Sequence, residues 1–247
     1  MRKFAALLCA LMLHSSYVEA EVENKEASSG PMADTDDTWK YRIRIGKLEK
    51  QFSSSNDDSY GEWAGFIAVG KALNTFWLTT KGGTQHGETD AAEVRLFYSR
   101  TIRPYLGVQL GLKRDLKPEP ERDWLGFGLL GVMPYKIGVD VSFFVGESGR
   151  TAARLEIAYQ YSFTPKLSLT PDLEANFYGE DDPERGIGSG FSDLDLGLRL
   201  RYQVISGVSP YAGLTWKANF GKTADIIESR GEDTSDLRLM LGVTLRF

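Results

Sequence analysis

The stretch SDLDLGLRLRY at residues 192–202 decides the fold. From position 193 onward every second residue is charged or glycine, and the residues between them are four leucines and a tyrosine. Side chains on a strand point alternately to opposite faces, so this alternation indicates a β-strand, whereas a helix would spread the leucines around its circumference. Two interpretations remain: a surface strand of a soluble sandwich, or a transmembrane strand of ~9–11 residues with one apolar face towards lipid.

The same alternation recurs from Trp39 to Phe247 and favours the second interpretation. It predicts twelve strands, although the facing of the strands at 60–69 and 74–83 is ambiguous because Phe76, Trp77 and Leu78 are consecutive. Short turns are predicted at 70–73, 102–104, 134–135, 164–166 and 204–209, and longer polar loops at 53–59, 84–88, 116–122, 147–150, 179–191 and 221–234.

An even number of strands with short turns on one side and longer loops on the other is typical of outer-membrane proteins. The sequence therefore predicts an all-β fold, a twelve-stranded antiparallel up-and-down transmembrane β-barrel at residues 39–247. A closed barrel leaves no edge strand with unpaired backbone groups in lipid, where each such group costs several kcal/mol.

Aromatic residues beside the short turns support this prediction, because Trp and Tyr gather at membrane interfaces. The chain also ends on Phe247, which resembles the C-terminal assembly signal of outer-membrane barrels. The aromatic residues that we assign to this girdle are Tyr98, Tyr105, Tyr135, Tyr161, Phe163, Tyr202, Tyr211 and Phe247.

The first 38 residues are expected to lie outside the barrel. Residues 1–20 have a basic start, a short apolar core and small residues near position 20, which together predict a secretory signal peptide. Residues 21–38 are rich in Glu, Asp and Ser and predict a flexible periplasmic arm. Cys9 is the only cysteine, so the mature chain would have neither a disulfide nor a cysteine-based metal site.

Composition argues against two classes of function. The formal net charge of -5 makes nucleic acid an unfavourable partner. An outer-membrane hydrolase of the phospholipase kind needs a His–Ser pair on the barrel wall, but the only histidine after residue 20 is His86, in a predicted loop with no serine beside it. We therefore expect a protein that is not an enzyme.

Four runs of the sequence resemble one family. They are AEVRLFYSRTIRPYLGVQLGLKRD at 92–115, FVGESGRTAARLEIAY at 144–159, NFYGEDDPERGIGSGFSDLDLGLRLRY at 176–202 and PYAGLTWKANFGKTAD at 210–225. They resemble the copper resistance protein B family, the outer-membrane proteins of bacterial copper-resistance systems. The resemblance implies a role in binding, exporting or sequestering copper at the outer membrane. It also implies outer-membrane lipid, copper ions and a periplasmic multicopper oxidase or copper carrier as partners.

The sequence departs from that family in its arm. Family members usually carry a long arm rich in Met and His before the barrel, but in the arm of this chain Met32 is the only Met or His residue. Thioether and imidazole groups are the side chains that suit copper. The candidate copper contacts are therefore Met32, His86, Met133 and Met240, of which Met240 has the parity of a lumen-facing residue. A general porin-like barrel without copper specificity is the alternative.

Charged residues on the predicted lumen face form a second set of candidates. We expect opposite charges on neighbouring strands to pair, which would stiffen and narrow the lumen, and the acidic members could also attract a hydrated cation. These residues are Arg154, Glu156, Asp172, Glu174, Asp193, Asp195, Arg199 and Arg201.

Overall fold

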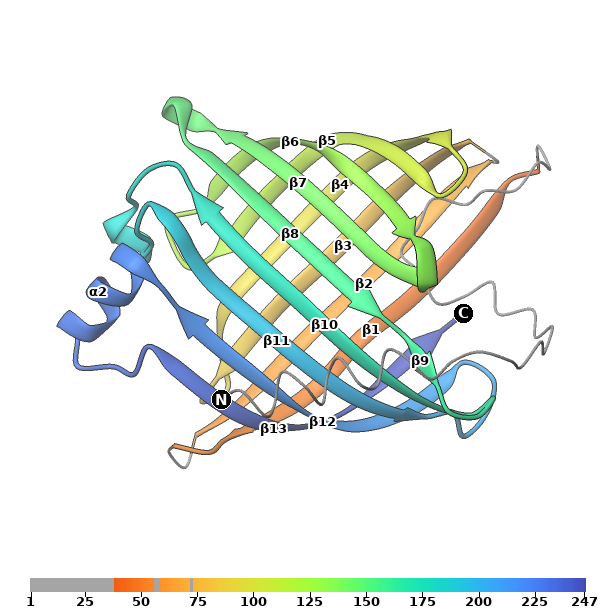
Figure 1. Cartoon of the computed structure of the whole chain (residues 1–247). Helices are drawn as coiled ribbons and strands as arrows, with labels where there is room; N and C mark the ends of the chain where they lie inside the picture. The colour runs from red at the N-terminus through yellow and green to blue at the C-terminus, as the bar shows by residue number, and fades with distance from the viewer. Residues whose placement is uncertain (1–37, 56–57, 72) are drawn as a thin grey trace.

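The structure, a computed structural model, describes residues 38–55, 58–71 and 73–247, so the predicted signal peptide, most of the predicted arm and Met32 lie outside the described residues. The described chain forms one antiparallel sheet that closes on itself (Figure 1). Its strands are β1 (Lys40–Ser53), β2 (Ser59–Lys71), β3 (Asn74–Gln85), β4 (Glu88–Arg103), β5 (Leu106–Lys117), β6 (Arg122–Met133), β7 (Ile137–Gly146), β8 (Thr151–Tyr159), β9 (Tyr161–Ser162), β10 (Leu167–Tyr178), β11 (Gly190–Tyr202), β12 (Val208–Asn219) and β13 (Ser235–Arg246).

The wall of the barrel consists of twelve strands, as the sequence predicts, when β8 and β9 are counted as one interrupted strand. The short β9 continues the line of β8, and both of these strands pair with β10. Pairing of β13 with β1 and of β10 with β11 completes the ring. No helix in the described ranges is long and apolar enough to cross a membrane.

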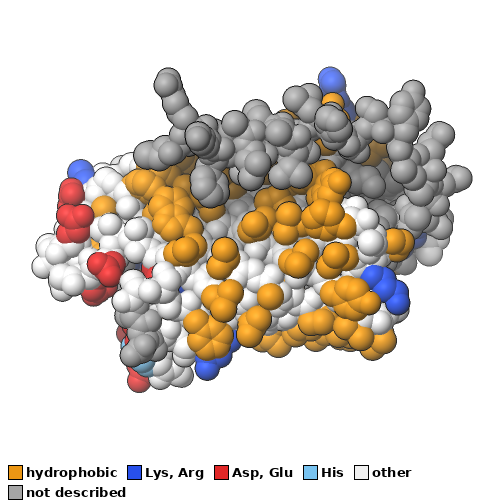
Figure 2. All heavy atoms as spheres, turned by 60° about the horizontal axis from the view of Figure 1, so that its bottom comes forward, with side chains coloured by type: hydrophobic (Ala, Val, Ile, Leu, Met, Phe, Trp, Pro, Cys, Tyr) orange, Lys and Arg blue, Asp and Glu red, His pale blue; other side chains and the backbone are white. Residues whose placement is uncertain are grey.

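The strand β11 has the predicted facing. Leu198, Leu200 and Tyr202 are exposed on the outside of the barrel, while Arg199 and Arg201 between them are buried. The ambiguous strand β3 is resolved in the same way, because Phe76 and Leu78 are exposed and Trp77 is buried. Hydrophobic side chains accordingly cover much of the wall that is visible in Figure 2.

A bulge in β1 changes the facing that simple alternation predicts. Trp39, Tyr41 and Ile43 are exposed as expected, but the register with β2 shifts between Ile45 and Lys47. Beyond the shift the other parity faces inward, so Glu49 and Gln51 are buried. A bulge adds one residue to a strand and turns every later side chain to the opposite face.

The two ends of the barrel differ in their connections. We name the end with the short turns the turn end, and it also carries Trp39 and Phe247. The opposite end is the loop end, on the left in Figure 1 with the helix α2. In outer-membrane barrels the short turns face the periplasm. The short helical turns in the connections are η1 (Pro134–Lys136) at the turn end, and η2 (Glu147–Gly149) and η3 (Pro183–Arg185) at the loop end.

At two positions where the sequence predicts a polar loop, the structure has a different kind of connection. The polar loop at 84–88 is a tight hairpin turn at His86 and Gly87, which have φ angles of 52° and 84°. Positive φ at both central residues matches the right-handed twist of the flanking strands. The predicted loop at 221–234 contains the helix α2 (Gly221–Ser229), a short segment in which only Ala224, Ile226 and Ile227 are apolar.

One member of the predicted aromatic girdle faces the other way. Tyr211 is buried, and its hydroxyl donates a hydrogen bond of 2.7 Å to the Glu49 carboxylate. Tyr105, Tyr135 and Phe247 are exposed near the turn end.

Candidate functional site in the barrel lumen

One side of the lumen is apolar. Ala68, Trp77, Phe97, Trp124, Leu130 and Phe144, from β2 to β7, form a buried cluster inside the barrel. The indole nitrogens are satisfied, since Trp77 donates to Ser99 over 2.8 Å and Trp124 donates to Asp115 over 2.9 Å. The Lys113 ammonium lies 4.6 Å from the centre of the Phe144 ring, which favours a cation over its face. Sequence alternation places Phe97 and Phe144 on the inner face, but nothing in it predicts that they meet.

The other side of the lumen is filled by ion pairs, and Arg199 of β11 is at their centre. Its guanidinium donates two hydrogen bonds of 3.1 Å to Glu49 of β1 and one to Asp172 of β10. The Arg199 side chain is 1% exposed and that of Glu49 0%. The Glu49 carboxylate also accepts a hydrogen bond from Gln51 over 2.7 Å. A buried carboxylate is tolerable because every lone pair faces a donor.

A glycine makes this cluster sterically feasible. Gly197 faces the lumen two residues before Arg199, where the alternation otherwise places charged side chains. A Cβ atom at this position would lie 2.7 Å from an Asp172 carboxylate oxygen. The glycine in the SDLDLGLRLRY stretch therefore leaves the space in which Arg199 and Asp172 meet.

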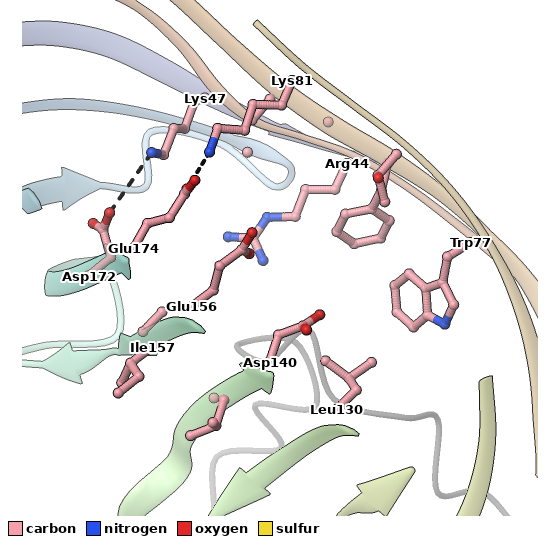
Figure 3. Close-up of a pocket in the computed structure, with 18 of the residues that line it drawn as sticks. Arg44, Lys47, Trp77, Lys81, Leu130, Asp140, Glu156, Ile157, Asp172 and Glu174 are labelled. Atoms are coloured by element: carbon pink, nitrogen blue, oxygen red, sulfur yellow. Dashed lines mark hydrogen bonds and ion pairs between the residues drawn. The ribbon is translucent and has the colours of Figure 1, made fainter. Parts of the chain in front are cut away.

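A second cluster is centred on Arg154 of β8. Arg154 donates two hydrogen bonds of 2.8 and 2.9 Å to Glu93 of β4 across the lumen. The Arg95 guanidinium also donates to Glu93, over 2.9 Å, and to Glu156, over 3.0 Å. Lys81 of β3 pairs with Glu174 of β10, again across the lumen (Figure 3).

A third group surrounds Glu62 of β2. Its carboxylate accepts hydrogen bonds from Lys47, over 3.0 Å, and from Lys217 of β12, over 2.7 Å. Gln51 donates a further bond of 2.9 Å. Of the predicted lumen residues, Asp195 is bonded to Thr215 and Asp193 to Asn176.

Seven of the eight predicted lumen charges line cavities inside the barrel, and the eighth, Asp195, pairs with Lys217 of the neighbouring strand β12 over 3.4 Å. Many of their partners, however, come from strands across the barrel rather than from neighbouring strands. Sequence reasoning missed these partners because alternation assigns a face but not the residue opposite. The missed residues that complete the clusters are Lys47, Glu49, Glu62, Lys81, Glu93, Arg95 and Tyr211.

The ion pairs divide the lumen into two cavities. One, towards the turn end, has a volume of about 310 Å³, and it lies between charged residues such as Arg44 and Asp172 and the apolar wall at Trp77 (Figure 3). The other, towards the loop end, has a volume of about 280 Å³. Lys81 and Glu93 line both cavities, so the paired charges form the partition between them.

The loop at 179–189 covers the loop end and is anchored to the wall. Arg185 reaches inward to Asp115 of β5 over 3.0 Å, and both side chains are buried. Asp182 accepts hydrogen bonds of 3.1 and 3.2 Å from Arg122 of β6. The long acidic loop is therefore not simply solvated, because its charges are paired with basic residues of the barrel.

The helix α2 holds this loop from the other side. Thr223 is buried and accepts a hydrogen bond of 2.9 Å from the Gly188 amide. Asp181 accepts one from the Ser189 amide over 2.7 Å and one from the Lys222 ammonium over 2.9 Å. The Ser189 amide, together with Lys222, lowers the pKa of the Asp181 carboxyl to about 2.

The structure does not bring the candidate copper contacts together. Met240 is fully buried in the wall of β13, in register with Gln51 and Gly213. His86 lies at the loop end with its Nε2 atom 2.8 Å from Asp58, and Met133 is exposed at the turn end. Within residues 38–55, 58–71 and 73–247 no group of three or more His, Cys, Asp or Glu side chains could hold a metal ion.

Comparison with solved structures supports the fold. The chain is similar to the NanC porin, with a TM-score of 0.57 over 83% of this chain and all of that one. The sequence identity is 11%, so the likeness concerns the barrel architecture alone.

Comparison of sequences gives the family. The chain is 38% identical over 201 residues to a copper resistance protein B homolog of Pseudomonas syringae, covering 81% of this chain and 68% of the relative. It is 32% identical over 212 residues to copper resistance protein B of Escherichia coli, covering 86% of this chain and 71% of the relative. The model of the copper resistance protein B precursor family matches residues 39–247, the whole barrel. The chain is therefore an outer-membrane β-barrel that belongs to the copper resistance protein B family.

Proposed function

We propose that this barrel contributes to copper resistance by binding copper at the membrane surface, for sequestration or for transfer to a periplasmic multicopper oxidase or copper carrier. The observation that carries the proposal is the 38% identity to a copper resistance protein B homolog over most of the barrel. The role is that of a binding protein rather than an enzyme.

The lumen argues for binding at the surface rather than conduction. Paired side chains from opposite walls separate the two cavities, and the anchored loop at 179–189 covers the loop end. An ion that crossed the barrel would have to displace several buried ion pairs. Breaking one such pair typically costs about 3–5 kcal/mol.

If copper does not enter the lumen, its ligands are residues outside the lumen. His86 is suited to this role because its side chain is 67% exposed and Asp58 orients the imidazole ring. Met133 is exposed at the turn end, and Met32 lies outside the described residues. Thioethers are soft ligands that favour Cu(I), and imidazole binds copper in general. His86 and Met133 lie at opposite ends of the barrel, so each would need further ligands from a partner protein to form a site.

Copper tolerance of cells tests the proposal. A strain that lacks the gene should tolerate less copper than the wild type, and the full chain should restore tolerance. The double variant His86→Ala/Met32→Leu should restore it less well at equal abundance in the outer membrane. Restoration of tolerance equal to that of the wild-type chain would contradict surface binding through these groups.

Conductance separates this proposal from the porin-like alternative. The purified barrel in a planar lipid bilayer should conduct far less than an open porin, because paired side chains fill its lumen. A large, stable conductance together with unchanged copper tolerance in the deletion strain would favour the general porin.

A further inference from the structure

Arg201 of β11 is a buried cation without a counter-ion in the part of the chain that the structure describes. The residue is 7% exposed, and no described carboxylate lies within ion-pair distance of its guanidinium. Its single hydrogen bond to a described residue goes to Thr170 over 2.6 Å, and its Nε atom is buried without a partner. A buried charge without a partner loses its hydration and gains no compensating contact. The arrangement is therefore costly unless something else supplies negative charge.

The carboxylates on this side of the lumen are bound to other cations. Glu49 and Asp172 both accept hydrogen bonds from Arg199. Figure 3 shows Asp172 turned towards Lys47 as well, at an ion-pair distance of 3.9 Å. The cluster around Arg199 thus uses its own acidic groups, and Arg201 remains as positive charge that the described wall does not compensate.

Two further polar side chains line the same cavity as Arg201. They are Thr170 of β10 and Gln160, which lies between β8 and β9. Both β8 and β9 pair with β10, and the register across the gap between them puts Gln160 opposite Thr170. Since β10 also pairs with β11, the three residues lie on three adjacent lines of the sheet, on the wall of the turn-end cavity.

All three side chains have hydrogen-bond donors to offer. The Thr170 oxygen accepts from Arg201, so its own hydroxyl hydrogen is available to a second acceptor. Within the described ranges the Gln160 amide and the second terminal nitrogen of Arg201 donate to no protein group. The planar guanidinium, which lies 5.3 Å from the centre of the Tyr211 ring, matches two oxygens of a carboxylate or phosphate. Donors without an acceptor beside a surplus positive charge suit an oxyanion.

We propose that the turn-end cavity binds a small soluble oxyanion, a phosphate or a carboxylate, between Arg201, Thr170 and Gln160. The cavity volume of about 310 Å³ is far above the ~10–15 Å³ that admits one water molecule, so such an ion fits together with water. The bound ion supplies the negative charge that Arg201 lacks.

The position of Arg201 favours an ion from the aqueous phase over a lipid headgroup. Leu200 and Tyr202, its neighbours in the chain, are exposed on the outside of the barrel, whereas Arg201 faces the lumen. A lipid phosphate lies outside the wall, on the side of Leu200 and Tyr202. The occupant of the site therefore enters from the solvent at the turn end.

An acidic residue confines the oxyanion to the β11 side of the cavity. Asp140 of β7 lines the cavity, and its carboxylate accepts hydrogen bonds from Gln109 over 2.9 Å and from Ser142 over 2.6 Å. These donors are neutral, so Asp140 keeps a negative charge that repels an anion. The inference goes beyond the proposed function, because the site takes an anion and its tests contain no copper.

Binding of inorganic phosphate tests the proposal directly. The full barrel, purified in non-ionic detergent without phosphate, is dialysed to equilibrium against radiolabelled phosphate. We expect saturable binding of one ion per barrel. Acetate should compete for the site, whereas sodium chloride at the same ionic strength should displace phosphate several-fold less. Binding that does not saturate, or that sodium chloride removes as well as acetate does, would reject the site.

Three variants locate the bound ion. Arg201→Met keeps a long side chain without the charge and should weaken phosphate binding roughly tenfold or more, because hydrogen bonds to a charged group are lost. Thr170→Val and Gln160→Leu keep the size of their side chains and should each weaken it several-fold. Arg230→Met, at an exposed arginine next to α2 at the loop end, is the matched control and should bind like the wild type. Unchanged affinity in Thr170→Val and Gln160→Leu would overturn the proposal even if Arg201→Met did not fold.

Stability separates a binding role of Arg201 from a structural one. A ligand that binds only the folded state stabilises it, so phosphate should raise the urea midpoint of the wild-type barrel. It should leave the midpoint of Arg201→Met unchanged, and without phosphate this variant should be at least as stable as the wild type, since it lacks the uncompensated charge. If phosphate does not move the wild-type midpoint and Arg201→Met unfolds at lower urea, Arg201 only supports the wall and the proposal is wrong.

Discussion

Arg199 and Glu49 are 150 residues apart in the chain, yet two hydrogen bonds of 3.1 Å join their side chains inside the barrel. In the sheet, β12 and β13 lie between β11 and β1, so the pair spans two strands next to the place where β13 pairs with β1 and closes the barrel. Neither residue could reach the other if the bulge in β1 did not turn Glu49 inward. Closure of the barrel and filling of its lumen therefore depend on the same local irregularity.

Arg199→Ala should destabilise the barrel strongly. The change leaves the buried Glu49 and the half-buried Asp172 without their shared cation, and removal of one partner from a buried pair typically costs about 3–5 kcal/mol. Urea unfolding in detergent, followed by tryptophan fluorescence, measures the loss. Arg114→Ala is the matched control, because the exposed Arg114–Asp123 pair contributes little. Equal unfolding midpoints for the two variants would contradict the importance of the buried cluster.

Gly197→Ala tests the space on which that cluster depends. The added Cβ atom would lie 2.7 Å from an Asp172 oxygen, so Arg199 and Asp172 must move apart. Overpacking of this kind typically costs about 1–3 kcal/mol, measured by the same unfolding experiment. Gly138→Ala is the control, because the nearest atom to its Cβ is 3.6 Å away. A Gly197→Ala barrel as stable as the Gly138→Ala barrel would show that the glycine is not needed for space.

The sequence predicts the strands of the barrel because a lipid face and a lumen face impose an alternation of apolar and polar residues on each strand. The stretch at 192–202 shows this most clearly, since each of its charged side chains and each of its exposed leucines takes the predicted face. Strands with Gly, Ala or consecutive aromatic residues, such as β3, carry a weaker signal. Trp77 and its two neighbours could not be assigned until pairing with β2 and β4 fixed the register.

The partners of the lumen residues could not be predicted in the same way. Alternation assigns Arg154 to the lumen, but its partner Glu93 lies on β4, and the contact depends on the diameter of the barrel and on side-chain length. The bulge at Gly46 and the inward turn of Tyr211 are decided by tertiary packing. The helix α2 is only nine residues long and is held by contacts such as Thr223 to Gly188, which cannot be read from the sequence.

The loop that covers the loop end should resist acid. The Ser189 amide and Lys222 bind the ionised form of Asp181 and lower its pKa to about 2 from an ordinary value of 3.8. Since the pKa of the folded state is the lower one, the contact is fully present above about pH 4 and is lost as the pH falls through about 2. Cleavage of intact barrels by an acid-active protease should therefore begin in the loop only near pH 2.

Asp181→Ala should make the loop at 179–189 susceptible already at pH 3, because the hydrogen bonds from the Ser189 amide and the Lys222 ammonium to the carboxylate are gone. Glu180→Ala, one residue earlier and with its side chain exposed, should behave like the wild type. If wild-type and Asp181→Ala barrels are cleaved at the same rate at pH 3, Asp181 does not hold the loop.

Met240→Leu decides between copper in the lumen and copper at the surface. The thioether of Met240 is fully buried, and its register neighbours Gln51 and Gly213 offer no soft or imidazole ligand. Arg238, two residues earlier on the same face, adds a positive charge that repels a metal ion. Copper sites usually combine several soft or imidazole ligands, so we expect the variant to keep wild-type copper tolerance.

The design of this test is favourable because Leu preserves the volume of Met. Such exchanges usually cost under ~1.5 kcal/mol, so the variant should assemble normally, and its amount in the outer membrane is measured alongside tolerance. Tolerance that falls to the level of the gene deletion at equal barrel abundance would place copper at the sulfur of Met240. The ion would then have to reach a fully buried atom, and the partition of ion pairs between the two cavities would have to open during function.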